Sequence, residues 1–418
     1  MAARLMNVYL MGTMYAAVVL IPTVVVYWIT AGVTPARVIC GILLILIVTV
    51  IVLLLSCILG WVVARISLKL KNKSFISVLI SLLFIGGYYF FYFKANDIIQ
   101  DIILHADVYG EKIKGAAYGL YLFGRVGEGD WLAAVVYTVV VAGLFALTWY
   151  ILQRSFLKIA TASADTVKVR YVERTAKEKS LFGALLGKEF ARFTASANYM
   201  LNCGLGTLLI PASGILLLVK GREVCEVLDA VFAARPGTTA ILLCCAFCMI
   251  VAMNDMVVPS VSLEGKSLWI PQSLPVSPKT VLRAKMSVQL LLTLIPMLFA
   301  VICAAVIVKT SVAVKLLLCV LPLVYTVFSA IFGLFIGLRM PILTWTNEMA
   351  PVKQSGAVAI AMFGGWIVCV VFAGLFMLVG YKIGAALYML LWIILFTIAA
   401  LLLQRWLDTK GVAAFAAL

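Results

Sequence analysis

The chain has 418 residues, of which 65% are hydrophobic and only 12% are charged, and its formal net charge is +16. Soluble globular proteins carry about 25% charged residues, so this composition excludes a soluble domain and predicts a polytopic membrane protein. The positive charge does not indicate a nucleic-acid partner, because the basic residues lie in short loops between apolar stretches.

Ten apolar stretches are each long enough for one membrane crossing of about 20 residues. They are continuous and lack the alternation of a membrane β-barrel, so we predict an all-α protein. The expected spans are residues 8–30, 38–63, 75–93, 131–152, 199–219, 238–258, 287–308, 314–338, 357–380 and 384–403.

The distribution of Lys and Arg predicts the orientation. With a cytoplasmic N-terminus, the inner segments carry twice as many basic residues as the outer segments, whereas the acidic residues divide almost evenly. Basic residues are retained on the cytoplasmic side. We therefore expect a multi-pass membrane protein with both termini in the cytoplasm.

Residues 1–155 form an expected N-terminal half with four spans. The third span is followed by the long outer loop 94–130, in which residues 95–104 have the pattern of an amphipathic helix lying on the outer surface. Such a helix either gates an exit for an amphiphilic substrate or packs as a lid, and the sequence does not separate the two.

Residues 156–198 form the largest cytoplasmic segment, and its end predicts an interfacial helix. Lys188, Glu189 and Arg192 share one side of residues 181–193, and apolar residues repeat at helical spacing on the other, namely Phe182, Leu185, Leu186, Phe190 and Phe193. A short basic amphipathic helix before a span lies in the membrane interface. The alternative is an extension of the next helix.

Residues 199–418 form an expected C-terminal unit with six spans. Asn254 and Asp255 come at the cytoplasmic end of its second span. An acid inside lipid costs about 2.5 kcal/mol or more, so Asp255 is either a proton or ion site or a solvated helix end, and its place beside Pro259 favours the solvated end. Cys244, Cys245 and Cys248 lie in the same span and are expected to be small buried residues.

The loop 260–285 contains Gly265-Lys266-Ser267, which resembles the end of a nucleotide-binding P-loop. A P-loop needs Gly-x-x-x-x-Gly-Lys-Ser/Thr after a strand, but Ser260 stands at the first glycine and an apolar span precedes it. We therefore predict no nucleotide site here. The loop is either an ordinary connection or a segment that contacts a partner.

Three cytoplasmic segments occur in a characteristic order. They are Lys188-Glu189-Phe190 leading to Asn198-Tyr199, then Leu263-Glu264-Gly265-Lys266-Ser267-Leu268-Trp269 with Ser273-Leu274-Pro275-Val276-Ser277, and then Trp345, Asn347-Glu348 and Val352-Lys353-Gln354-Ser355. Together they resemble the ABC-2 type permeases of ABC exporters, over about residues 180–360. The resemblance implies an elbow helix, six spans, and a coupling helix between the second and third spans. It also implies a location in a bacterial cytoplasmic membrane.

The resemblance also implies a partner, a separate ABC ATPase chain that drives the permease from the cytoplasm. Its expected contacts are Glu264, Gly265, Lys266, Trp269, Leu274, Pro275 and Ser277, with Trp345, Glu348 and Lys353 as a second cytoplasmic contact and Lys188, Glu189 and Arg192 in the elbow helix. Trp269 and Leu274 offer apolar anchors, and Glu264 and Lys266 are expected to set register with charged groups of the ATPase. A second permease chain and membrane lipid are further expected partners.

The first half echoes part of the second half. Ser56-Cys57-Ile58-Leu59-Gly60 with Arg65 is similar to Ser329-Ala330-Ile331-Phe332-Gly333 with Arg339. This predicts a pseudo-repeat of four plus six helices, in which the first two helices of an N-terminal unit are absent from the sequence. Chance similarity between apolar stretches is the alternative.

No constellation for catalysis, for a cofactor or for a metal is evident: His105 is the only histidine, and no span carries a pair of acids. We therefore expect a protein that is not an enzyme. The alternative to an ABC permease is an ion-coupled secondary transporter that uses Asp255.

Overall fold

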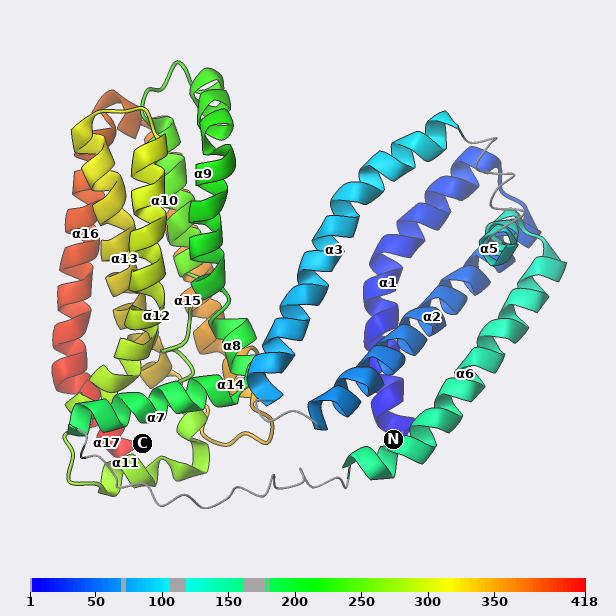
Figure 1. Cartoon of the computed structure of the whole chain (residues 1–418), viewed down its shortest axis with the longest axis horizontal. Helices are drawn as coiled ribbons and strands as arrows, with labels where there is room; N and C mark the ends of the chain where they lie inside the picture. The colour runs from blue at the N-terminus through cyan, green and yellow to red at the C-terminus, as the bar shows by residue number, and fades with distance from the viewer. Residues whose placement is uncertain (1, 69–72, 106–117, 161–177, 179) are drawn as a thin grey trace. The chain divides into compact units, whose positions relative to one another are not determined.

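The computed structural model describes residues 2–68, 73–105, 118–160, 178 and 180–418. Helices, turns and loops make up these ranges, and none of the described residues is in a strand. The all-α prediction is therefore confirmed. The chain divides into two compact units, Met1–Glu173 and Arg174–Leu418, which Figure 1 draws in blue to cyan and in green to red.

The first unit contains long apolar helices. They are α1 (Ala2–Ala31), α2 (Pro35–Leu68), α3 (Lys73–Leu104) and α6 (Trp131–Ala160), with the shorter α5 (Tyr118–Glu128) before α6. Helix α2 packs against α1, α5 and α6. Residues 95–104 are the last turns of the continuous helix α3, so the prediction of a separate surface helix there is wrong.

Helices α1, α2 and α6 enclose an apolar groove of about 720 Å³ in the first unit. Tyr9 of α1, Leu46 and Leu53 of α2, and Phe145 and Trp149 of α6 are among its walls. Such walls accept hydrocarbon and reject a polar solute, because burying a polar group without a hydrogen bond is costly.

The second unit contains the helical bundle and its cytoplasmic elements. The bundle helices are α8 (Ala197–Cys203), α9 (Gly206–Val231), α10 (Thr238–Val251), α12 (Pro278–Ile307), α13 (Val312–Arg339), α15 (Gly356–Leu378) and α16 (Ala385–Trp406). The shorter elements are α7 (Leu181–Ala195), η1 (Ser262–Ser267), α11 (Trp269–Ser273), α14 (Met349–Val352), η2 (Gly380–Lys382), η3 (Leu407–Gly411) and α17 (Val412–Ala417).

Serine side chains cap five helices of this unit, α7, α8, α12, α13 and α15. Their hydroxyl oxygens accept hydrogen bonds from backbone N–H groups in the first turns of these helices, and the serines are Ser180, Ser196, Ser277, Ser311 and Ser355. An N-cap of this kind satisfies a donor that the helix leaves unpaired. Pro278 follows Ser277 at the first position of α12, where its missing N–H costs nothing.

Eight helices in the described residues are long and apolar enough to cross a membrane, or nine if α8 and α9, which meet at a bend of 47°, form one span. The chain is thus a polytopic membrane protein. The expected ten spans are reduced because α10 has only 14 residues and ends at Val251. The predicted span 238–258 is therefore wrong in its second part.

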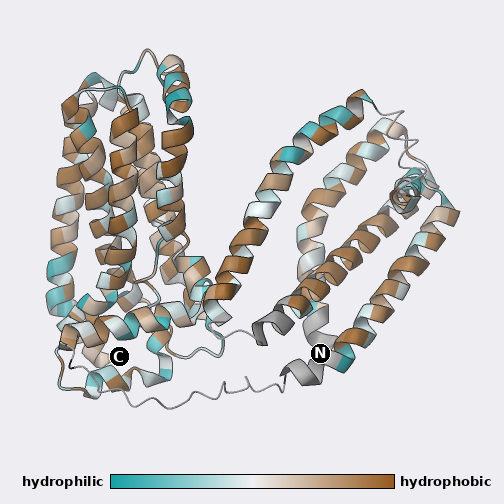
Figure 2. Cartoon of the chain, in the orientation of Figure 1, coloured by the Kyte–Doolittle hydropathy of each residue, from teal (hydrophilic) through white to brown (hydrophobic). Residues whose placement is uncertain are grey.

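The core of the second unit lies between α9, α10, α12, α13, α15 and α16, which pack against one another in pairs. Buried aromatic rings of Tyr325, Phe372, Phe376, Tyr388 and Phe396 fill its centre. Outward residues of the same helices are large and apolar, as membrane lipid requires. Figure 2 shows this hydrophobic character along the long helices, with hydrophilic residues gathered near their ends.

The segments that were expected in the cytoplasm gather at one end of the second unit. Helix α7 crosses this end of the bundle, and α11, α17 and the C-terminus lie beside it (Figure 1). The candidate site is built from these elements.

Candidate functional site

An unwound, buried segment follows α10. The helix ends at Val251, and the chain continues through tight turns such as Asn254 N–H to Val251 O at 2.9 Å and Ser260 N–H to Val257 O at 3.2 Å. All of the residues from 252 to 265 are buried except the half-buried Met253. Non-helical backbone at membrane depth is tolerated only where protein or a watery cavity surrounds it. This segment therefore connects the bundle interior to the cytoplasmic elements.

Lys285 of α12 is the centre of a buried ion network. Its side chain is fully buried, and its Nζ donates to Glu264 Oε1 at 2.7 Å, Glu189 Oε1 at 3.0 Å and the carbonyl oxygen of Ser260 at 3.0 Å. An ammonium group has three protons to donate, so each of them has an acceptor. Burial of this charge is compensated by two carboxylates and one carbonyl.

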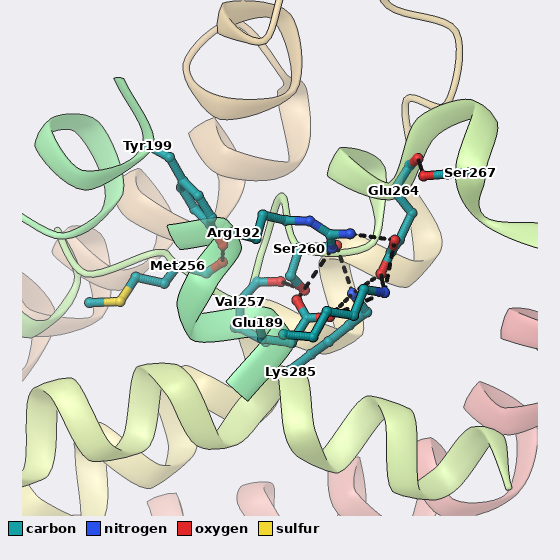
Figure 3. Close-up of polar contacts among 10 residues, drawn as sticks. Glu189, Arg192, Tyr199, Met256, Val257, Ser260, Glu264, Ser267 and Lys285 are labelled. Carbon is teal, nitrogen blue, oxygen red and sulfur yellow. Dashed lines mark hydrogen bonds and ion pairs between the residues drawn. The ribbon is translucent and has the colours of Figure 1, made fainter. Parts of the chain in front are cut away.

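Two further cations complete the network from helix α7. Lys188 Nζ lies 3.0 Å from Glu264 Oε1, and Arg192 donates to Glu264 Oε2 and, at 3.3 Å, to Glu189 Oε2. Figure 3 shows the dashed contacts among Glu189, Arg192, Glu264 and Lys285 converging from different elements. The network joins α7, η1 and α12 by charge-assisted hydrogen bonds, which are roughly twice as strong as neutral ones.

The electrostatics of Glu264 follow from this arrangement. Burial raises the pKa of its carboxyl, but the Arg192 hydrogen bond and the Lys285 charge outweigh burial and hold the pKa well below its ordinary value. Glu264 is therefore ionised whenever the protein is folded near neutral pH. Its side chain is only 1% exposed, so the expectation that it sets register with charges of a partner is wrong, because all its oxygens serve the internal network.

Helix α7 has the position and length expected for the elbow helix, but the orientation of its polar side differs. The buried residues of α7 are Leu185, Glu189 and Phe193. Glu189 therefore lies on the buried face of the helix, together with these two apolar residues. The sequence pattern separated charged from apolar residues and therefore placed Glu189 on the solvated side. A buried partner, Lys285, is what makes the inward position favourable.

The second cytoplasmic loop is fixed to the first. Trp345 Nε1 donates to the carbonyl oxygen of Ser262 at 2.8 Å, and the Ser262 hydroxyl accepts from the backbone N–H of Ile342 at 3.0 Å. The Trp345 ring lies over Gly265, whose φ of +52° is a left-handed conformation that favours glycine. Trp345 and Gly265 thus hold the two loops together, and Gly265 is buried beneath the Trp345 ring.

Glu348 and Lys353, the other two residues of the expected second cytoplasmic contact, have different surroundings. Glu348 Oε2 accepts a hydrogen bond of 2.7 Å from Ser196 Oγ, between α7 and α8, whereas Lys353 is exposed at the end of α14. Lys353 is therefore accessible to a partner, and Glu348 is a structural contact.

A short apolar helix remains exposed at this end of the unit. Trp269 and Ile270 of α11 are 65% and 44% exposed, and Leu274 immediately after it is 47% exposed. Lys266, Pro275 and Ser277 are also exposed, and Ser277 additionally caps α12. Behind them, Leu268 and Pro271 are buried. An exposed tryptophan on a segment anchored from below is typical of a protein contact surface.

The C-terminus supports α11, which the sequence did not predict. Gln272 Nε2 donates to the carbonyl oxygen of Phe415 at 2.8 Å, and the Phe415 side chain is fully buried. Asp408 forms ion pairs with Lys279 at 2.9 Å and Arg283 at 3.4 Å. These contacts join residues far apart in the sequence, and an apolar C-terminal stretch alone does not reveal them.

The unwound segment also carries buried polar side chains that the sequence placed in solvent. Asn254 and Asp255 are 0% and 4% exposed, so the expectation of a solvated helix end is wrong. Asn254 Nδ2 lies 3.2 Å from Thr293 Oγ1, and Gln289 Oε1 accepts from the backbone N–H of Val257 at 3.0 Å. Gln289 and Thr293 of α12 were missed, although polar residues one helical turn apart in an apolar span are a readable signal.

Cys244, Cys245 and Cys248 are buried in α10 as expected. Among the described residues, no group of three or more His, Cys, Asp or Glu side chains is placed to hold a metal ion. The chemistry at this end of the unit is thus ion pairing and apolar contact.

One comparison with known proteins identifies a family. A family model described as membrane protein of 12 TMs matches residues 3–405. No curated protein and no solved structure matches the chain. Since the matched range covers nearly the whole sequence and the helices are those of a multi-span protein consistent with a transporter, the chain belongs to this family of membrane proteins with 12 transmembrane segments.

Proposed function

We propose that the chain is the permease subunit of an ABC exporter of the ABC-2 type, driven by a separate ATPase that docks on residues 260–285. The observation that carries the proposal is the exposed apolar helix α11, which directly follows η1, the element that the buried ion network joins to α7 and α12. The membrane lipid around the long helices is a second partner, and another permease chain is a third.

A permease driven from outside needs a stiff element that transmits force. Pro271 and Pro275 shorten the segment and limit its backbone freedom. Lys285 joins the segment directly to α12, a helix of 30 residues. A displacement of α11 thereby moves α12 and α7 together, and an ATPase biases the two arrangements of the bundle by its differential affinity for them.

The chain itself lacks the parts of a nucleotide site. Gly265 and Lys266 stand in η1, which no strand precedes within the described residues, and Ser260 occupies the first P-loop glycine position. Gly265 is packed under Trp345, so the loop does not present a phosphate cradle. These features support an external source of ATP energy.

Photo-crosslinking tests the proposal. A photoreactive residue in place of Trp269 should crosslink to a protein whose sequence contains a complete P-loop. The same residue in place of Trp131, which is 53% exposed at the start of α6, should not. Crosslinks from position 269 to lipid alone, or to the same molecules as position 131, would contradict the docking surface.

A secondary transporter remains the second candidate, and one observation favours it. Asp255 is a buried acid without an ion-pair partner among the described residues, and such acids mark proton or ion pathways. Substrate movement by reconstituted chain under an ion gradient, with no ATPase present, would select this candidate over the permease.

A further inference from the structure

We propose that Asp255 is a proton-binding site, loaded in the conformation described here and discharged when the unwound segment after α10 opens. The ligand is a single proton. The inference does not depend on whether an ATPase or an ion gradient drives the chain, so its failure and that of the permease proposal are separable.

The second unit has three buried carboxyl side chains, of which two contact cations and one does not. Glu189 and Glu264 each contact Lys188, Arg192 and Lys285 within 4 Å. The carboxyl group of Asp255, a residue with an exposed fraction of 4%, forms no hydrogen bond or ion pair with the described residues. An uncompensated buried carboxylate takes up a proton and becomes neutral, because neutralisation costs less than burying the charge.

The groups that face Asp255 do not supply a compensating charge. Cys203 of α8 and Tyr325 of α13 lie close enough to be affected by its charge, and the Tyr325 hydroxyl contacts Cys369 of α15 at 3.7 Å. Thiols and phenols are neutral at physiological pH. These neutral groups do not destabilise the protonated form of Asp255, and they supply no positive charge that would stabilise its ionised form.

The charged groups of α12 and α7 and the carboxylate of Glu348 make their contacts with residues other than Asp255. In α12 the ammonium of Lys285 is bound to Glu189 and Glu264, in α7 the guanidinium of Arg192 binds the same pair, and near α14 Glu348 accepts from Ser196. Cys248 of α10 is buried and apolar in its surroundings. Binding a proton is therefore how Asp255 avoids the free-energy cost of burying an unpaired negative charge.

The place of Asp255 couples the proton to movement. The next residues are held from three sides: Tyr199 donates from its hydroxyl to the Met256 carbonyl, Gln289 accepts from Val257 N–H, and Lys285 donates to the Ser260 carbonyl. Asp255 thus lies on the short segment that joins α10 to the ion network and α11. Opening this segment admits water, which stabilises the carboxylate and releases the proton.

The sign of the stability effect follows from the proton. A free carboxyl of an unfolded chain ionises at about pH 3.9, whereas the folded chain keeps its proton to higher pH. The contribution of Asp255 to the free energy of unfolding is therefore largest at acidic pH and decreases as the pH rises. Asp255→Asn, an uncharged isostere, removes this loss.

The test uses the full chain in detergent, with unfolding followed by tryptophan fluorescence. Asp255→Asn should melt near the wild-type temperature at acidic pH and higher, by on the order of several degrees, at alkaline pH. The matched control Glu264→Gln should melt lower than wild type at neutral pH, because it weakens a paired carboxylate. A lower melting temperature of Asp255→Asn at every pH would overturn the proposal.

A measurement on the unmodified chain covers the case in which the variant fails to fold. Unfolding at neutral pH in weak buffer with a pH indicator should release about one proton per chain. Infrared spectra of the folded chain should contain the carbonyl band of a protonated carboxylic acid. Absence of both the proton and the band shows an ionised Asp255 and refutes the proton site.

Discussion

At the scale of single residues, Lys285 is the side chain whose removal we expect to lower the folding stability most. Its ammonium binds two buried carboxylates at once, so its removal leaves Glu189 and Glu264 in the low-dielectric interior with only the two cations of α7 as partners. Removing one partner of a buried ion pair costs about 3–5 kcal/mol, far more than an intact pair contributes. The network is thus a device for holding α7, η1 and α12 in one arrangement.

Lys285→Met should lower the free energy of unfolding by about 3–5 kcal/mol, measured by thermal or denaturant unfolding of the purified chain. Lys266→Met, at an exposed position in the same loop, should change it by less than about 0.5 kcal/mol. Equal effects of the two substitutions would mean that the network does not hold these elements together.

The acid dependence of stability reports on Glu264. Since its pKa is lowered by folding, its contribution is complete above the ordinary carboxyl pKa and is lost as pH falls below it. The wild-type chain should therefore lose melting temperature on acidification below about pH 4.3, and Glu264→Gln should lose less over the same range. Parallel curves for the two proteins would be inconsistent with a paired carboxylate.

At the scale of elements, the close approach of α13 to the unwound segment positions the site. A Cβ on Gly337 would collide with the backbone carbonyl of Val258, and one on Gly333 would lie 2.9 Å from the Val257 side chain. These two glycines, one turn apart, let a non-helical backbone lie directly on a helix. The segment is thereby fixed by α13 on one side and by α12 on the other.

Gly337→Ala should therefore destabilise the protein by about 1–3 kcal/mol through overpacking. Gly364 of α15 is the matched control, because a Cβ there meets nothing within 4 Å, and Gly364→Ala should be neutral or slightly stabilising. Thermal unfolding of both variants tests this contrast. A harmless Gly337→Ala would show that the segment does not rest on α13.

The elements show what sequence patterns predict and what they leave out. Periodicity predicts the helix at residues 181–193, the resemblance implies a short helix in the loop 260–285, and the structure contains both as α7 and α11. The end of α10 was missed, because Met256, Val257 and Val258 continue its apolar character although the backbone is unwound. Hydropathy reports burial and not backbone conformation, so an apolar run does not show where a helix stops.

Pairings across long sequence distances were also beyond the sequence. Glu264 was selected as a surface charge, yet Lys285 of α12 and Glu189 of α7 make it an interior one. A charge that is buried by a partner looks identical in sequence to a charge in solvent. The assignment of Trp269 and Leu274 as exposed anchors was correct in exposure, and their binding role stays a prediction.

At the scale of the whole molecule, each of the two units contains helices long and apolar enough to cross a membrane. In the second unit, the segments expected on the cytoplasmic side share one end of the bundle (Figure 1). The matching family is described by 12 transmembrane segments, whereas the described residues contain eight or nine spanning helices and the shorter α10. The division into four plus six helices stays a prediction.

Cysteine labelling tests the orientation. Gln100→Cys, at the exposed end of α3, should react with an impermeant thiol reagent added to intact cells, and Ser273→Cys, at the end of α11, should react only after permeabilisation. The native cysteines are buried or half-buried, which limits background. The reverse pattern would invert the orientation expected from the basic residues.

The central claim is that an ATPase moves this chain through α11. It is tested most directly by ATP turnover of the chain reconstituted with the ATPase found by crosslinking. The account predicts no turnover by the chain alone, turnover by the complex, and a loss of about tenfold or more in ATPase affinity for Trp269→Ala, with Trp131→Ala unchanged. Undiminished affinity and turnover with Trp269→Ala, or turnover by the isolated chain that Lys266→Ala abolishes, would contradict it.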